Sequence, residues 1–126
     1  MEADLHALLS ADPSIGAIVG LAGSARIYPL LMPQGGALPA VTYQRISTPR
    51  IDTASMLGHN ARVRCRMQVD CWAPTFAQAK ALSDAVRAAM ATATTFTALA
   101  VDERHTYEDD TRIYRASADY SCWYIE

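Results

Sequence analysis

Lysine is nearly absent from this chain of 126 residues. Ten arginines and a single lysine, Lys80, stand against 13 carboxylate residues, so the net charge is −2. Proteins that bind nucleic acid without sequence preference usually carry an excess of positive charge, which displaces counterions from the phosphates. Because this excess is missing, the composition argues against a general DNA-binding function.

Cysteine is also scarce, and Cys65, Cys71 and Cys122 are an odd number. They are too few for a disulfide scaffold. Cys65 and Cys71 lie on one expected strand, roughly 20 Å apart at about 3.3 Å per residue, whereas a disulfide needs Cα atoms within about 7 Å. Cys122 could meet either one across a sheet. We expect all three to be small buried hydrophobic residues in a reducing compartment.

Long hydrophobic runs are missing too. No apolar run reaches the ~18 residues of a membrane-spanning helix, and the first residues, MEADLHALLSAD, are acidic and polar-interrupted, unlike a secretory signal. We therefore expect a protein that folds in the cytoplasm and has no membrane partner. The length and the 51% hydrophobic content fit one globular domain, residues 1–126.

Motifs for chemistry are not found either. The sequence has no phosphate-binding loop and no Gly-x-Ser-x-Gly elbow. His6, His59 and His105 are scattered and lack the spacing of a helical zinc site. We predict no catalytic residue, no metal and no cofactor.

Several carboxylates gather around the last expected hairpin: Asp102, Glu103, Glu108, Asp109 and Asp110. On an exposed turn, without burial among apolar groups, they would be ordinary solvated charges. The alternative function in this class is a small hydrolase that uses His105 with Glu108, and a deep pocket lined by that pair would favour it.

What the sequence does contain is alternation. Residues 61–72, ARVRCRMQVDCW, place an apolar side chain at every second position, which is the period of a β-strand with one buried face. Residues 40–47 and the last strand, from Tyr114 to Tyr124, follow the same pattern. Between the last two strands we expect a tight turn at Asp109 and Asp110.

Helices are expected in three places. Residues 2–11 form a short amphipathic helix, Asp12 and Pro13 begin a second one, and Gly20 ends it. A long helix begins after Thr75, which forms a capping box with Gln78. Its core-facing stripe has spacings of three and four and comprises Phe76, Ala79, Leu82, Val86 and Met90.

These elements predict an α+β fold: a single two-layer domain. An antiparallel sheet of about four strands is covered on one face by one long helix and one or two short N-terminal helices. Residues 26–40 contain three prolines and two glycines, so we expect a turn-rich edge with little regular pairing.

The other face of this sheet is rich in arginine and tryptophan. Its candidate contact residues are Arg62, Arg64, Arg66, Trp72, Arg115 and Trp123. Three arginines in a row on one strand repel each other unless neighbours compensate, and arginine and tryptophan are enriched at protein–protein hot spots. The alternative is a water-facing surface with ion pairs inside the chain, each worth under roughly 1 kcal/mol.

A second candidate contact is the segment 48–60, TPRIDTASMLGHN, which shows no sustained period. We expect a long loop between two strands, either a flexible hairpin tip or a segment that binds something. Its candidate contact residues are Arg50, Ile51, Met56, Leu57 and His59.

The order of these segments resembles the tail-completion, or tail-terminator, proteins of long-tailed bacteriophages and prophages. The resemblance runs through ALLSADPSIGAIVG, RIYPLLMPQGGALPAVTYQRIS, RCRMQVDCWAPTFAQAKALSDAVRAAM and YEDDTRIYRASADYSCWY. The middle segment, in which a strand ends in Asp-Cys-Trp and leads into an alanine-rich helix, is the most specific part.

The resemblance implies a structural protein that forms a ring, typically of six copies, at the head-facing end of the tail tube. Such a ring stops tube polymerisation and docks onto the head connector, and duplex DNA passes through it without specific binding. Its place is the tail–head junction of the virion, assembled in the cytoplasm of the bacterial host. A head–tail adaptor of the same particles is the related alternative. In a ring, we expect Arg62, Arg64 and Arg66 to face acidic groups across a subunit or tail boundary, with the carboxylates of the last hairpin as acceptors.

Overall fold

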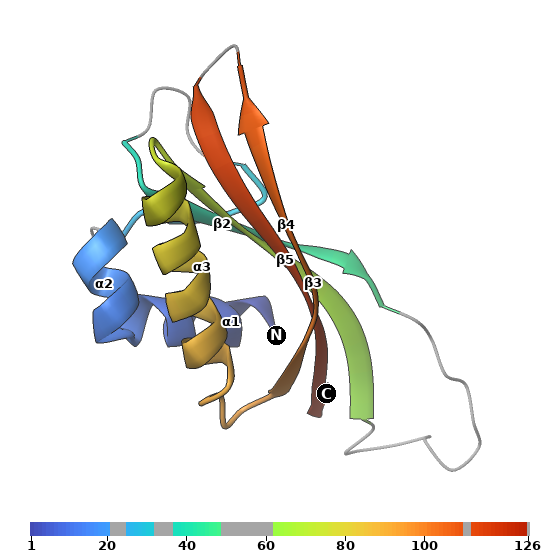
Figure 1. Ribbon diagram of the computed structural model, residues 1–126. Coiled ribbons are helices and arrows are strands. Elements are labelled where there is room, and N and C mark those ends of the chain that lie inside the picture. The colour runs from blue at the N-terminus through green and yellow to red at the C-terminus, as the bar shows by residue number, and fades with distance from the viewer. Residues whose placement is uncertain (21–24, 32–36, 49–61, 110–111, 126) are drawn as a thin grey trace.

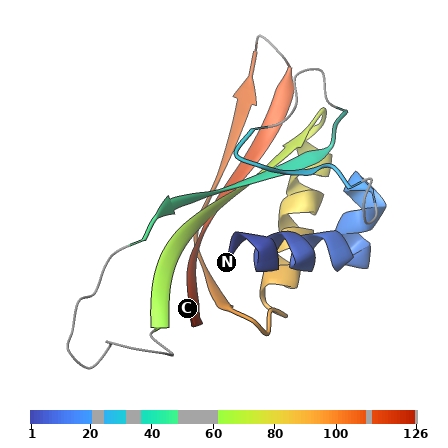
Figure 2. The ribbon, with the colours of Figure 1, turned by 180° about the vertical axis from the view of Figure 1, so that it is seen from behind.

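The computed structural model describes residues 1–20, 25–31, 37–48, 62–109 and 112–125. Its chain order is α1 (Glu2–Ala11), α2 (Pro13–Val19), β1 (Ile27–Pro29), β2 (Ala40–Ser47), β3 (Arg62–Ala73), α3 (Phe76–Met90), β4 (Thr97–Glu108) and β5 (Ile113–Ile125). All three helices lie on the same side of a strongly twisted sheet (Figures 1 and 2). The predicted α+β class is confirmed.

The two N-terminal helices begin and end where the sequence predicts. The Asp12 carboxylate accepts hydrogen bonds from the backbone N–H of Ser14 and Ile15 at 2.9 and 3.1 Å, and Pro13 is the first residue of α2. These contacts satisfy amides that have no partner inside the helix. Gly20 ends α2 with a φ of 99°, a backbone conformation that glycine adopts without a steric penalty.

The long helix α3 also begins as predicted, because the Thr75 hydroxyl accepts a hydrogen bond from the Gln78 N–H at 3.2 Å. Leu82, Val86 and Met90 are buried against the sheet. Phe76 was predicted to belong to the same buried stripe, and this is wrong: its side chain is 50% exposed. It is the first residue of the helix, and its ring neighbours are His105 and Tyr114 from the end of the β4–β5 hairpin, which leave half of it open.

Within the described residues the sheet has five strands in the order β1-β2-β3-β5-β4, so the prediction of about four antiparallel strands needs correction. The pairs β2–β3, β3–β5 and β4–β5 are antiparallel, whereas β1 pairs with β2 in parallel. The extra strand comes from the segment 26–40, which was expected to pair little. It spans only three residues and ends at Pro29, so it is too short to show an alternating pattern.

The core lies between the helices and the inward rows of β3 and β5. The predicted apolar row of β3 is confirmed, since Cys65, Met67, Val69 and Cys71 are buried. Cys65 stands directly opposite Cys122 on β5, and all three cysteines are free and buried, as expected. Burial raises the pKa of the Cys122 thiol to about 12, so this group stays protonated at neutral pH.

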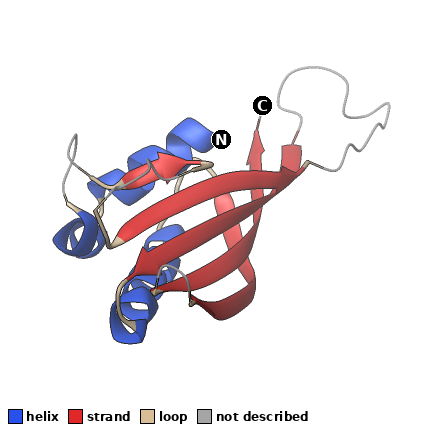
Figure 3. Cartoon of the chain, turned by 90° about the horizontal axis from the view of Figure 1, so that it is seen from above, coloured by secondary structure: helices blue, strands red, loops and turns tan. Residues whose placement is uncertain are grey.

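The two chain ends lie close together (Figures 1–3), and Arg45 joins the elements that carry them. Its guanidinium donates to both carboxylate oxygens of Glu2 at 2.7 and 2.9 Å and to the Tyr124 hydroxyl at 3.2 Å. This bidentate geometry fixes the start of α1 against β2 and β5.

This contact predicts a pH-dependent contribution to stability. The hydrogen bond from Arg45 holds the pKa of Glu2 below its usual value of 4.5. A lowered folded pKa stabilises the protein above the unfolded value, and the contribution is lost as pH falls through the folded pKa. In urea titrations, Glu2→Gln should therefore cost up to about 1 kcal/mol at pH 7. The difference from the natural chain should shrink as the pH falls below 4.5 and through the lowered pKa of Glu2.

Asp4→Asn is the matched control for this prediction. Asp4 lies in the same first turn of α1 and forms no ion pair within the described part of the chain. A cost that is equal for both variants, or that persists unchanged at acidic pH, would contradict the role assigned to the Arg45 contact.

Candidate assembly interface

The face of the sheet that points away from the helices, called here the outer face, is polar but largely buried. Its buried polar residues come from three neighbouring strands and are Thr42, Gln68, Asp70, Ser117, Asp119 and Ser121. They are covered by longer arginine and tryptophan side chains of the same face. The outer face is therefore not a simple water-facing surface with every polar group solvated.

At the centre of the outer face, Arg66 is paired inside the chain. Its guanidinium donates to the Asp119 carboxylate at 2.8 Å, and Asp119 is only 8% exposed while Arg66 is 44% exposed. Arg104 on β4 lies 3.7 Å from the second Asp119 oxygen and 2.8 Å from Asp102. Arg66 and Asp102, which the sequence proposes for contacts between chains, thus have partners within this chain.

At one end of the face, Arg115 is held in a similar way. It donates to Asp70 at 3.0 Å, and its guanidinium lies 5.1 Å from the centre of the Trp72 ring. The Trp72 indole N–H donates to the Thr42 hydroxyl at 3.0 Å, and Gln68 donates to both Asp70 oxygens at 3.0 Å. This end is a connected polar network, so we assign Arg115 and Trp72 a stabilising role within the chain as well.

Arg64 differs from its neighbours in the row. It is exposed, donates to the Ser121 hydroxyl at 3.2 Å and stacks over Trp123 with 5.4 Å from the guanidinium carbon to the ring centre. In the described part of the chain it forms no ion pair. For Arg62 only the backbone is described, and it pairs with Ile125.

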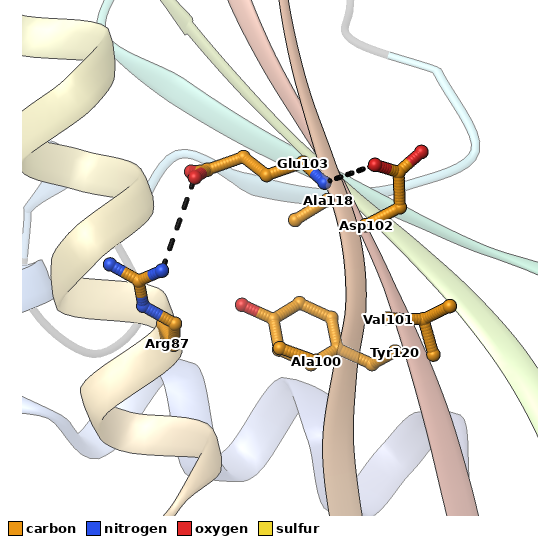
Figure 4. A pocket seen from close by; sticks show the side chains of 7 residues that line it. All are labelled: Arg87, Ala100, Val101, Asp102, Glu103, Ala118 and Tyr120. Carbon is orange, nitrogen blue, oxygen red and sulfur yellow. Dashed lines mark hydrogen bonds and ion pairs between the residues drawn. The ribbon is translucent and has the colours of Figure 1, made fainter.

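Three exposed apolar side chains lie on the same face as Arg64, and the sequence pattern did not identify them. Leu99 is 60%, Val101 52% and Ile125 59% exposed. Leu99 pairs with Ser121, the residue that Arg64 contacts, and Ile125 pairs with Arg62. Figure 4 shows Val101 and Asp102 on the side of β4 that points away from α3. We call the group Arg64, Leu99, Val101, Trp123 and Ile125 the Trp123 patch.

A β-bulge explains why Val101 is on this side. The register of β4 against β5 shifts between Ala100 and Asp102, so one residue has no partner. In Figure 4, Glu103 and Tyr120 point toward α3, and beside them lies a pocket of about 210 Å³. The pocket is lined by Arg87, Ala100, Val101, Asp102, Glu103, Ala118 and Tyr120. The signal in the sequence is the run TALAV at the start of β4, which does not alternate.

The carboxylates that the sequence groups around the last hairpin lie in different places in the structure. Asp102 lies on the outer face, whereas Glu103 points toward α3, accepts a hydrogen bond from Ser83 and lies 3.8 Å from the Lys80 ammonium. Glu108 and Asp109 are exposed at the hairpin end, and Asp110 lies outside the described residues. The five carboxylates therefore do not form one acidic cluster.

A cluster of ring side chains occupies the helix side of the same hairpin. Tyr107 and Tyr114 have ring centres 4.6 Å apart, and Phe76 lies 5.4 Å from His105 and 6.2 Å from Tyr114. We call Phe76, His105, Tyr107 and Tyr114 the ring cluster. Phe76 and Tyr107 are among the exposed large hydrophobic residues of the protein.

The geometry does not support a hydrolase that uses His105 with Glu108. These residues are three positions apart on a strand, so their side chains leave from opposite faces. The carboxylate 4.0 Å from His105 Nε2 belongs to Glu103 instead. Neither His105 nor Glu108 lines the pocket at the β4 bulge.

The expected contact loop cannot be placed in this geometry. Its residues Arg50, Ile51, Met56, Leu57 and His59 lie outside the described residues. Within the described ranges, no group of three His, Cys, Asp or Glu side chains is arranged to hold a metal ion. None of the helices described is long and apolar enough to cross a membrane.

Comparison with known protein families shows to which family this chain belongs. The sequence profile of the family described as tail completion protein gp17 matches residues 3–125. This chain belongs to that family. The resemblance drawn from the order of its segments is confirmed, and the chain is thus a structural tail protein of phages or phage-like particles.

Solved structures agree with the fold of a tail completion protein. A chain of the "Virion of native gene transfer agent (GTA) particle" superposes with a TM-score of 0.68 at 18% sequence identity, covering 100% of this chain and 95% of that chain. At this identity the likeness demonstrates the fold alone. No curated protein matches the sequence.

Proposed function

We propose that this tail completion protein caps the head-facing end of the tail tube as a ring of six copies. In this position it stops tube polymerisation and joins the tail to the head connector. The observation that carries the proposal is the family match over residues 3–125. Its partners would be further copies of itself, the tail-tube protein and the connector, and its place would be the tail–head junction of the virion.

The size of the domain is compatible with such a ring. A compact chain of this length has a radius of gyration of about 14 Å and is about 36 Å across. Six touching spheres leave a central hole about as wide as one of them, which admits duplex DNA. The net charge of −2 suits passage without specific binding, because a strongly basic lumen would retain DNA.

In this proposal the chain works through protein contacts and has no catalytic role. The outer face supports this, because tryptophan, arginine and exposed apolar residues together are typical of protein–protein hot spots. Three buried polar atoms on β5, Arg115 Nε, Ser117 Oγ and Asp119 Oδ1, have no hydrogen-bond partner in the described part of the chain. Such atoms are usually paired by a neighbouring chain or an ordered water.

Removal of the gene from cells that produce the particle tests this function. We expect electron micrographs to show overlong tails or tails without heads, together with filled heads that lack tails. Expression of the natural chain from a second copy of the gene should restore finished particles. Normal particles in the absence of the protein would refute the proposed function, and normal-length tails with defective heads would favour a head–tail adaptor instead.

A further inference from the structure

We propose that the Trp123 patch of one copy binds the ring cluster of the next copy, so that the ring closes through one repeated head-to-tail contact. The inference rests on the proposed ring and identifies the two surfaces that form it. The occupant of each surface is therefore a second copy of this chain.

The chemistry of the two surfaces is complementary. The Trp123 patch combines exposed aliphatic side chains with the guanidinium of Arg64, which forms no ion pair in the described part of the chain. The ring cluster offers the faces of Phe76 and Tyr107, and the exposed carboxylate of Asp109 lies at the same hairpin end. Guanidinium groups bind both aromatic faces and carboxylates.

The position of the two surfaces excludes a contact within one chain. The Trp123 patch lies on the outer face where β4 begins and β5 ends, whereas the ring cluster lies on the helix side where β4 ends and β5 begins. About eight residues of β4 separate Leu99 from Tyr107, which is about 26 Å at about 3.3 Å per residue. Because the two surfaces lie on opposite faces and at opposite ends of the sheet, the Trp123 patch can contact a ring cluster only in another copy of the chain.

Two different surfaces that fit each other produce a heterologous contact. Such a contact repeats from copy to copy and closes into a ring when the rotation between neighbours is suitable. A symmetric dimer would instead require one surface that fits itself. The heterologous arrangement is favoured, since two Trp123 patches facing each other would bring two arginines together.

Charge exchange tests this contact. Arg64→Glu and Asp109→Arg are each expected to reduce assembly tenfold or more, because each places like charges across the interface. A 1:1 mixture of the two variants should assemble again. In an alternating ring, the new glutamate of the first variant meets the new arginine of the second, and the unchanged Arg64 of the second meets the unchanged Asp109 of the first.

The measurements are native mass spectrometry of the purified full-length chains and the yield of finished particles, with thermal unfolding to show that each variant folds. If the purified natural chain does not assemble on its own, the yield of finished particles is the measurement that tests the contact. Tyr107→Ala should also reduce assembly, and Asp4→Arg, which changes a charge on α1, should not. Single variants that assemble normally, or a mixture that does not assemble, would overturn the inference. The proposed function would be unaffected by that result, because the gene-removal experiment tests it separately.

Discussion

Replacing Arg66 with glutamate is expected to lower the free energy of unfolding by about 3 kcal/mol. The Arg66 guanidinium is the hydrogen-bond partner of Asp119 Oδ2 at 2.8 Å, and Asp119 is only 8% exposed. The substitution removes this cation and puts a second carboxylate beside a buried one. Because domains of this size are stable by only about 5–15 kcal/mol, the loss should be obvious in urea or thermal unfolding.

Arg64→Glu is the matched control, because it makes the same charge reversal two positions away on the same strand. Arg64 contacts a hydroxyl and an indole ring and no carboxylate within the described residues, so we expect a loss of about 1 kcal/mol. Its main effect should be on assembly. Equal destabilisation by both substitutions would contradict the distinction that the structure makes between these two arginines.

Leu82→Ala is expected to cost about 3 kcal/mol, within the range measured for leucine truncations in protein cores. Leu82 is fully buried in the middle of α3 and faces the inward rows of β3 and β5. The loss combines the transfer of apolar groups with the cavity that remains when the surrounding side chains cannot close over it. Urea denaturation measures this loss of unfolding free energy: the midpoint should fall while the slope m, the change of free energy per molar urea, stays the same.

Phe76→Ala is the control for the same helix. The helical spacing assigns both residues to one stripe, but the half-exposed Phe76 should cost no more than about 1 kcal/mol despite its larger side chain. We expect this variant to be folded and to assemble poorly, since Phe76 belongs to the ring cluster. A loss for Phe76 that equals that for Leu82 would mean that the ring cluster is part of the core.

The strands and helices were predictable because their signals are local. Alternation in residues 61–72 identified the buried row of β3, and Asp12, Pro13 and Gly20 marked both ends of α2. These signals act over a few residues, through backbone geometry and capping hydrogen bonds. Strand β1 was not predictable in the same way, because its three residues are shorter than any period.

The candidate site was predictable only in outline. The arginines and tryptophans on one face predicted that the outer face is a contact surface. The same pattern does not distinguish Arg64 from Arg66. Their partners on β5 are 57 and 53 residues away in the sequence. The exposure of Leu99 and Val101 follows from the position of β4 at the edge of the sheet and from its bulge, and neither is visible in a single strand.

The sequence by itself determined which residues of β3 and β5 face inward, where the helices begin and the family to which the chain belongs. Only the tertiary structure decided which arginine is held by a buried carboxylate and which one remains available for another chain. The physical reason is that alternation is a property of one strand, whereas the charge opposite a side chain depends on which distant strand pairs with it.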